Sequence, residues 1–156
     1  MIATAVVATA LALAPAAAPA AGAPVATLEI PSLGLRALVC EGITAGVLAR
    51  GPGHYPGTSL PGRGGTIGIA GHRVTHTRPF LRINELRDGA RILLTRLGRR
   101  HVYRVFAMRI VAPTDVWAVR RRPAVETLVL TACHPPRTDL RRLVVFASRD
   151  DALTPP

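Results

Sequence analysis

Residues 125–148 read VETLVLTACHPPRTDLRRLVVFAS. Two apolar segments lie within this stretch, TLVLTAC at 127–133 and LVVFAS at 143–148, and both are rich in the residues that β-strands favour. Pro135 and Pro136 end the first segment, because proline has no N–H to donate to a sheet. The stretch therefore predicts two strands, with Cys133 at the rim of a sheet rather than in its middle.

Short apolar segments of the same kind recur along the chain, separated by Gly and Pro, at residues 28–43, 66–72, 91–97 and 101–113. The first predicts two strands around a turn, and the last two predict a hairpin about Gly98. Helical signals are few. Residues 43–51 favour one or two helical turns, and residues 79–86 place Phe80, Ile83 and Leu86 at helical spacing behind Pro79. Many short strands with few helices predict an all-β barrel or sandwich.

The N-terminal residues differ in composition from the rest of the chain. Residues 2–14 are apolar apart from two Thr, which is short for a membrane span of about 20 residues but suits a signal-peptide core or a weak anchor. Residues 15–25 resemble a Pro/Ala linker. We expect residues 1–25 to form an export or membrane-anchor segment that adds no strand, residues 26–150 to form one folded domain, and residues 151–156 to form a tail.

The chain is strongly basic, with a net charge of +11 carried by 20 Arg and no Lys. Such a charge is a footprint of nucleic-acid or anionic-surface binding. However, the arginines are scattered, no nucleic-acid-binding motif is present, and only 4% of residues are aromatic, so no stacking platform for bases is predicted. We expect no nucleic-acid partner.

Two cysteines, Cys40 and Cys133, are too few for a disulfide framework or a structural zinc site. A thiol at a sheet rim is open to a substrate, and its nucleophilic thiolate needs a nearby base or cation. His72 ends the apolar segment TIGIAGH at 66–72 and is a candidate for that base. Position alone leaves two other interpretations of Cys133 open: a small buried apolar residue, or a disulfide with Cys40.

Three segments together resemble the signature of the sortase family: TLVLTACHPP at 127–136, IAGHRVTHTRPF at 69–80 and RLVVFAS at 142–148. The order His, Cys, Arg matches the family, and Arg142 follows Cys133 by nine residues. The segments GPGHYPGTSLPG at 51–62 and APTDVW at 112–117 are similar to class E sortases of GC-rich actinobacteria. The resemblance covers about residues 27–149.

This resemblance implies a closed eight-stranded β-barrel with one or two short helices, tethered to the cell membrane by its N-terminus with the catalytic domain outside. The family cleaves a C-terminal sorting signal between Thr and Gly and joins the new carboxyl end to an amine of the cell wall or of a pilin. Cys133 would be the nucleophile, His72 the acid and base, and Arg142 the donor to the oxyanion. We expect a monomer that needs no cofactor and no metal.

Four neighbours of these residues are candidates for substrate binding: Thr131, Ala132, His134 and His76. Ala132 is a departure, because the family usually carries Thr or Ser before the cysteine. His76 and Thr77 stand where class E members that act on LAxTG signals have Tyr, so LPxTG and LAxTG signals both remain open. Arg141 also opens the last strand, and the two arginines must face opposite ways. Alternation does not choose between them; the resemblance favours Arg142.

Two further functions remain open at the level of sequence. The same thioester could be passed to water, which would make the protein a cysteine peptidase. A non-catalytic peptide-binding barrel with a bond between Cys133 and Cys40 is the second alternative.

Overall fold

The computed structural model describes residues 17–115, 117–120 and 123–154. These residues form eight strands: β1 (Pro24–Ile30), β2 (Leu35–Glu41), β3 (Gly53–His54), β4 (Thr66–Ala70), β5 (Arg91–Arg96), β6 (Arg99–Val111), β7 (Thr127–His134) and β8 (Arg141–Arg149). The helices are α1 (Ala45–Arg50), α2 (Trp117–Arg120) and two 3₁₀ turns, Pro31–Leu33 and Ile83–Glu85. The expected hairpin about Gly98 is present as β5 and β6.

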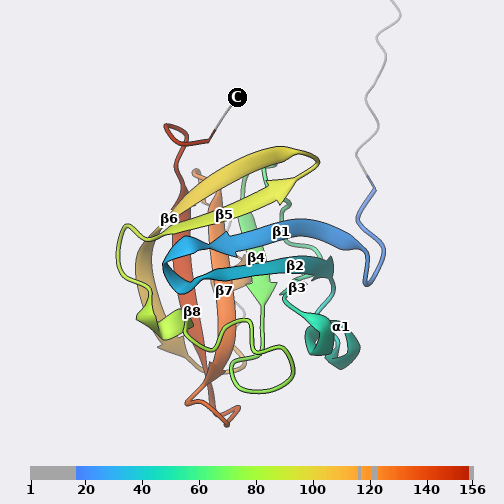
Figure 1. Ribbon diagram of the computed structural model, residues 1–156, viewed down its shortest axis with the longest axis vertical. Coiled ribbons are helices and arrows are strands. Elements are labelled where there is room, and N and C mark those ends of the chain that lie inside the picture. Colours follow the sequence, from blue (N-terminus) through green and yellow to red (C-terminus); the bar gives the residue numbers. More distant parts are fainter. Residues whose placement is uncertain (1–16, 116, 121–122, 155–156) are drawn as a thin grey trace, which may run out of the picture.

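The strands close into one barrel in the order β1-β2-β3-β4-β7-β8-β6-β5 (Figure 1). Most neighbours are antiparallel, but β2–β3 and β4–β7 are parallel pairs. A closed barrel leaves no sheet edge exposed. This architecture confirms the predicted all-β, closed eight-stranded barrel with two short helices.

Side-chain alternation divides the residues of β7 and β8 between the inside and the outside of the barrel. Leu128, Leu130 and Ala132 of β7 point inward, and together with Leu143 and Val145 of β8 they join the main core. The residues between them face outward. Each fully buried Leu or Ile contributes roughly 1.5–3 kcal/mol, so this core fixes the strand register, since a slip of one residue would turn every side chain over.

A second, smaller apolar cluster covers the outside of the barrel. It contains Val129 of β7, Val144 and Phe146 of β8, Val111 of β6 and Ala118 of α2. Trp117 stacks on Phe146 with ring centroids 5.9 Å apart. The outer face of β7 and β8 is therefore apolar around Val129, Val144 and Phe146, where it packs against α2.

Two local expectations differ from the structure. Residues 79–86 do not form an α-helix; they form successive turns with bonds from residue i+3 to residue i, including the 3₁₀ turn Ile83–Glu85. Phe80, Ile83 and Leu86 are all buried, and their spacing of three residues matches the period of a 3₁₀ helix.

The folded domain also begins earlier than the expected boundary at residue 26. Strand β1 starts at Pro24, and the Gly22 N–H donates to the Glu41 carbonyl while the Glu41 N–H donates to Ala23. The expected export or anchor segment falls mainly on residues 1–16, which lie outside the described residues. Among the residues that are described, no helix is long and apolar enough to cross a membrane.

Candidate active site

Cys133 and Arg142 lie opposite each other on neighbouring strands. In the antiparallel pair β7–β8, Cys133 is the register partner of Arg142, and His134 is the partner of Arg141. Directly opposed residues of an antiparallel pair project from the same face of the sheet. Arg142 therefore shares the outer face with Cys133, whereas Arg141 projects from the other face. The strand register thus shows which of the two arginines shares the face of Cys133, which alternation within β8 alone did not.

The parallel pair β4–β7 directs the chain before His72 toward the end of β7 that carries Cys133. The register ends at Ala70 opposite Thr131, and the Gly71 N–H extends it by donating to the Thr131 carbonyl over 3.0 Å. Beyond the last pair, two residues after Ala70 is His72 and two residues after Thr131 is Cys133. Cys133 thus stands on the central strand of three, between β4, which leads to His72, and β8, which carries Arg142 near its start.

Phe80 holds the backbone around His72 in place. The Phe80 N–H donates to the His72 carbonyl over 3.0 Å, and the fully buried Phe80 ring packs against Gly71. A Cβ atom at residue 71 would lie 2.6 Å from a Phe80 ring carbon, closer than real Cβ atoms approach carbon. Only glycine at this position lets the chain pass over the ring and present His72 beyond it.

Burial, and to a smaller extent the nearby His76 ring, lower the pKa of His72 below its ordinary value of 6.5. The two imidazole rings stack with centroids 4.8 Å apart. Both influences disfavour the imidazolium, since burial removes solvation and a second positive ring repels it. At neutral pH His72 is therefore predominantly the neutral imidazole, the form that accepts a proton.

Arg73 is a residue of the site that sequence reasoning did not single out. It is buried, 5% exposed, and its Nη1 lies 3.4 Å from the Cys133 carbonyl oxygen and 3.3 Å from His134 Nδ1, while Nη2 donates to Asn84 Oδ1 over 2.8 Å. The side chain thus ties the end of β7 to the segment after His72. An arginine following a histidine carries no sequence signal that distinguishes it from a surface arginine.

Thr131 lies two residues before Cys133 and therefore faces outward as well. Its hydroxyl is 2.8 Å from the Tyr55 hydroxyl, so a long loop residue meets β7 next to the proposed nucleophile. Nothing in the sequence marks Tyr55 as a partner of Thr131. The structure places a hydroxyl pair on the Cys133 face even though Ala132 carries no hydroxyl.

The remaining candidate residues are placed differently. Ala132 is 3% exposed and packs into the main core, and His134 projects from the same inner face of β7, where its ring meets Arg73. His76 is exposed and stacks on His72. The structure therefore brings Thr131 and His76 to the Cys133 face, and it directs the side chains of Ala132 and His134 away from that face.

The Arg142 guanidinium is held by the loop that precedes it. Its Nη1 donates to the Asp139 carbonyl over 2.9 Å and to the Arg141 carbonyl over 3.0 Å. Three of the five guanidinium N–H groups lie on the other two nitrogens, so the side chain keeps donors for an anion. Both cysteines are free thiols, and the described residues contain no cluster of three or more His, Cys, Asp or Glu that could hold a metal ion.

These features define a class of protein: a closed β-barrel that carries a thiol, an imidazole and a guanidinium at one end. A family model for the sortase domain matches residues 28–150, and the chain belongs to the sortase family.

Individual sortases resemble the chain in sequence and in structure. Sortase D of Bacillus subtilis is 32% identical over 108 residues, and Sortase SrtE1 of Streptomyces coelicolor is 32% identical over 136 residues. These matches cover 69% and 78% of the chain, but only 53% of Sortase D and 39% of SrtE1, so the chain spans about half or less of these relatives.

Solved structures extend the comparison. Sortase E1 of Streptomyces coelicolor with a tripeptide in its active site superposes with a TM-score of 0.78 at 30% identity, covering 86% of this chain and 92% of that one. Sortase C of Clostridium perfringens with a C-terminal cell wall sorting motif gives 0.79 at 26% identity, covering 85% and 73%.

Proposed function

We propose that the protein is a sortase transpeptidase that cleaves a sorting signal of the LPxTG or LAxTG kind between Thr and Gly and transfers the acyl group to an amine. The observation that carries the proposal is the register of three strands. Cys133 is paired directly with Arg142 on one side, and the β4–β7 register leads to His72 on the other.

In the first half of the reaction the Cys133 thiol gives its proton to His72, and its sulfur attacks the carbonyl carbon of the substrate Thr. The new C–S bond produces an oxyanion, to which the Arg142 guanidinium donates hydrogen bonds. His72 then passes its proton to the departing Gly nitrogen as the C–N bond breaks, which leaves a thioester on Cys133.

In the second half an amine attacks the thioester carbonyl. His72 removes a proton from the attacking nitrogen, the C–S bond breaks, and the sulfur leaves as the thiol once it is reprotonated. The neutral form of His72, which its lowered pKa favours, is the form needed at the start of both halves. Either the Arg142 Nη1 leaves the loop carbonyls and donates to the oxyanion, or Nε and Nη2 donate to the oxyanion while Nη1 keeps its bonds to the loop.

The substrate peptide lies on the outer face of β7 and β8 in this proposal. From Cys133 that face continues past Thr131 toward Val129 and Phe146, which are themselves buried, and Trp117 provides the exposed aromatic wall beside them. An apolar wall suits an extended peptide that carries an apolar residue upstream of the scissile Thr–Gly bond, as the Leu of both signals is. The sorting motif bound to the Clostridium sortase C supports a peptide of this class.

The amine acceptor and the location follow from the family resemblance. We propose an amine of a peptidoglycan precursor or of a pilin as acceptor, and a catalytic domain outside the cell membrane on the N-terminal segment. The domain would act as a monomer, without metal or cofactor.

Mass spectrometry of the full chain tests the proposal. Incubation with LPxTG and LAxTG peptides should add an acyl mass to Cys133, and added glycine or diaminopimelic acid should convert it to a ligated peptide. Cys133→Ala should form neither species, whereas Cys40→Ala, the matched control on β2, should form both. Acylation without ligation for every amine tried would make the protein a peptidase, and acylation of the Cys133→Ala variant would overturn the assignment.

A further inference from the structure

The end of the barrel opposite Cys133 contains a strongly basic cavity. It has a volume of about 350 Å³ and is lined by Arg63, Arg96, Arg99, His101 and Arg149, with Leu97 and the Pro61–Gly62 loop at its rim. Figure 1 shows the β5–β6 turn and the C-terminal end of β8 at the top of the barrel, and the loop that follows β7 at the bottom. We call this cavity the basic pocket.

The basic pocket is the continuation of the barrel interior. His101 is paired with Leu94, a core residue, so both project inward, and the next inward pair toward the turn is Arg96 with Arg99. Arg149 is the partner of the buried Tyr103 and also projects inward. Where the alternation of β5 and β6 would place apolar side chains to close the barrel, the chain carries charged ones.

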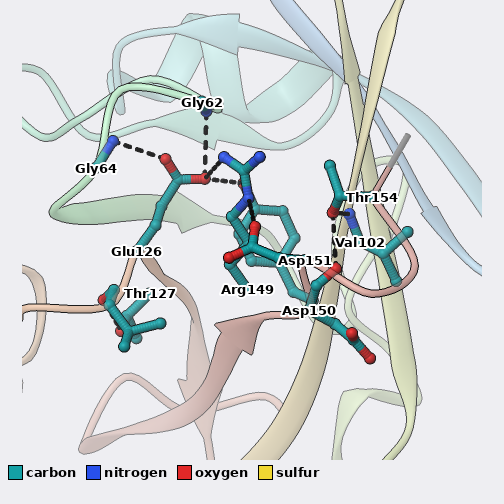
Figure 2. A network of polar contacts seen from close by, with 11 residues as sticks. Gly62, Gly64, Val102, Glu126, Thr127, Arg149, Asp150, Asp151 and Thr154 are labelled. Carbon is teal, nitrogen blue, oxygen red and sulfur yellow. Dashed lines mark hydrogen bonds and ion pairs between the residues drawn. The ribbon is translucent and has the colours of Figure 1, made fainter. Parts of the chain in front are cut away.

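The charges in the basic pocket are poorly balanced by the protein. Figure 2 shows Arg149 in contact with Asp151 and Glu126. The Arg149 Nε lies 2.7 Å from Asp151 Oδ1, and its Nη1 lies 3.7 Å from Glu126 Oε1. Arg63, Arg96 and Arg99 form no ion pair with any residue that the structure describes. Like charges directly opposite on a hairpin are destabilising, and Arg96 and Arg99 are such a pair.

Two buried nitrogen atoms at the basic pocket lack partners. His101 is 6% exposed, and neither its Nδ1 nor the Nε of Arg96 has a hydrogen-bond partner among the described residues. A buried polar group without a partner costs about 1–3 kcal/mol, and the Arg96 Nε–H is a donor, so an acceptor bound at this place would relieve that cost. Burial, and next the charge of Arg149, lower the pKa of His101, and a bound anion would raise it again.

The wall of the basic pocket is held rigidly. The buried Glu126 accepts hydrogen bonds from the Gly62 N–H over 3.2 Å and the Gly64 N–H over 2.7 Å (Figure 2). It also accepts one from the Tyr103 hydroxyl over 2.6 Å. Gly62 has a φ of +81°, and its Cα lies against the His101 ring, where a Cβ would approach Cε1 to 2.7 Å. The loop that carries Arg63 is thus anchored next to His101.

We propose that the basic pocket is a second binding site, separate from the active site, for a phosphate group. Planar guanidinium groups match phosphate oxygens with two parallel hydrogen bonds, and three unpaired arginines balance one or two phosphate charges. A carboxylate would use only part of this donor set. The phosphate is either a free inorganic or soluble ester or the headgroup of an anionic phospholipid. Strand β1 starts at the same end, since its Thr27 pairs with Thr95, next to Arg96.

The test uses the full chain and the double variant Arg96→Gln/Arg99→Gln. The matched control is Arg91→Gln/Arg100→Gln, which removes the same charge from the same hairpin at exposed residues outside the pocket. Inorganic phosphate is titrated at constant ionic strength, with chloride as the reference, while NMR follows the His101 ring. Vesicles of phosphatidylglycerol and of phosphatidylcholine form a second arm.

We expect phosphate to shift the His101 resonances, and the double variant to bind at least tenfold more weakly while the control stays within about twofold. Without phosphate the double variant should melt at or above the wild-type temperature, because repulsion has been removed; phosphate should raise the melting temperature of the wild type and of the control only. Arg63→Gln, a single change in the exposed loop, should weaken phosphate binding without affecting the barrel.

Phosphatidylglycerol vesicles that bind in a manner dependent on Arg96 and Arg99 would identify a lipid headgroup as the source, and binding of soluble phosphate alone would identify a free ester. The proposal is overturned if chloride shifts His101 as phosphate does, if the control loses as much affinity as the double variant, or if the double variant melts lower without phosphate, which would make the arginines structural.

Discussion

Gly71→Ala tests the claim that close packing beneath the loop positions His72. The new Cβ would lie 2.6, 2.8 and 2.9 Å from three Phe80 ring carbons, and ordinary contact needs at least about 3.4 Å, so the chain or the ring must move by close to 1 Å. Phe80 is fully buried and has no space to enter. The backbone moves instead, and it carries His72 with it.

The magnitude follows from these contacts. Overpacking costs about 1–3 kcal/mol of unfolding free energy, offset by less than about 1 kcal/mol from the lower entropy of the unfolded chain. Displacing a catalytic group by about 1 Å can cost on the order of 100-fold in rate. We therefore expect thioester formation on Cys133, measured in a single turnover, to slow by about 10- to 100-fold.

Denaturant unfolding and the single-turnover assay are run on Gly71→Ala, Phe80→Leu and the double variant. The smaller side chain at residue 80 should restore part of both losses in the double variant, a coupling that contact between two residues produces. Gly46→Ala is the control, because a Cβ at residue 46 of helix α1 meets nothing within 4 Å. Wild-type rates in Gly71→Ala, or losses that Phe80→Leu leaves unrelieved, would refute the reasoning.

Three other outcomes are expected. Arg142→Ala should lower the transpeptidation rate about 100- to 1,000-fold, as removal of an oxyanion donor does, and Arg141→Ala less than about tenfold; the reverse ranking would assign the wrong face of β8. His76→Asn should raise the pKa of His72 toward 6.5, since one cause of its lowering is removed, so the NMR titration midpoint of His72 should move to higher pH; an unchanged midpoint would leave burial as the whole cause. Deleting residues 1–21 should leave the unfolding free energy of the domain unchanged. Deleting residues 1–25 should lower it by about 2–4 kcal/mol, because β1–β2 hydrogen bonds and the burial of Val25 are lost. Equal stability of the two truncations would contradict the observed start of β1.

Much of the barrel was predictable because its strands are local features of the sequence. The β-rich segment 127–133 with two prolines behind it, and the hairpin about Gly98, both appear where the pattern placed them. The segment 79–86 was not predictable from spacing alone, since residues three apart fit an α-helix and a 3₁₀ turn alike. In the 3₁₀ turns that form instead, Phe80 is buried against Gly71, a residue outside the segment.

The face of each site residue depended on pairing, which no single strand contains. That Arg142 and not Arg141 accompanies Cys133 follows from the register of β7 with β8, and sequence alternation could only exclude the two acting together. The contact of Arg73 with Cys133 and the contact of Tyr55 with Thr131 could not be predicted for the same reason. Each joins residues at least 60 positions apart in the sequence.

The parallel pairing of β4 with β7 also has a consequence for when the protein can react. These two strands are separated in the sequence by the whole β5–β6 hairpin and α2, so the segment that leads to His72 and the end of β7 that carries Cys133 come together only through a pairing of distant strands. An incompletely folded chain holds an ordinary cysteine without its imidazole or its guanidinium. Under the proposed function the reactivity of the Cys133 thiol therefore depends on this long-range pairing, and a chain that has not yet formed it should not form the thioester.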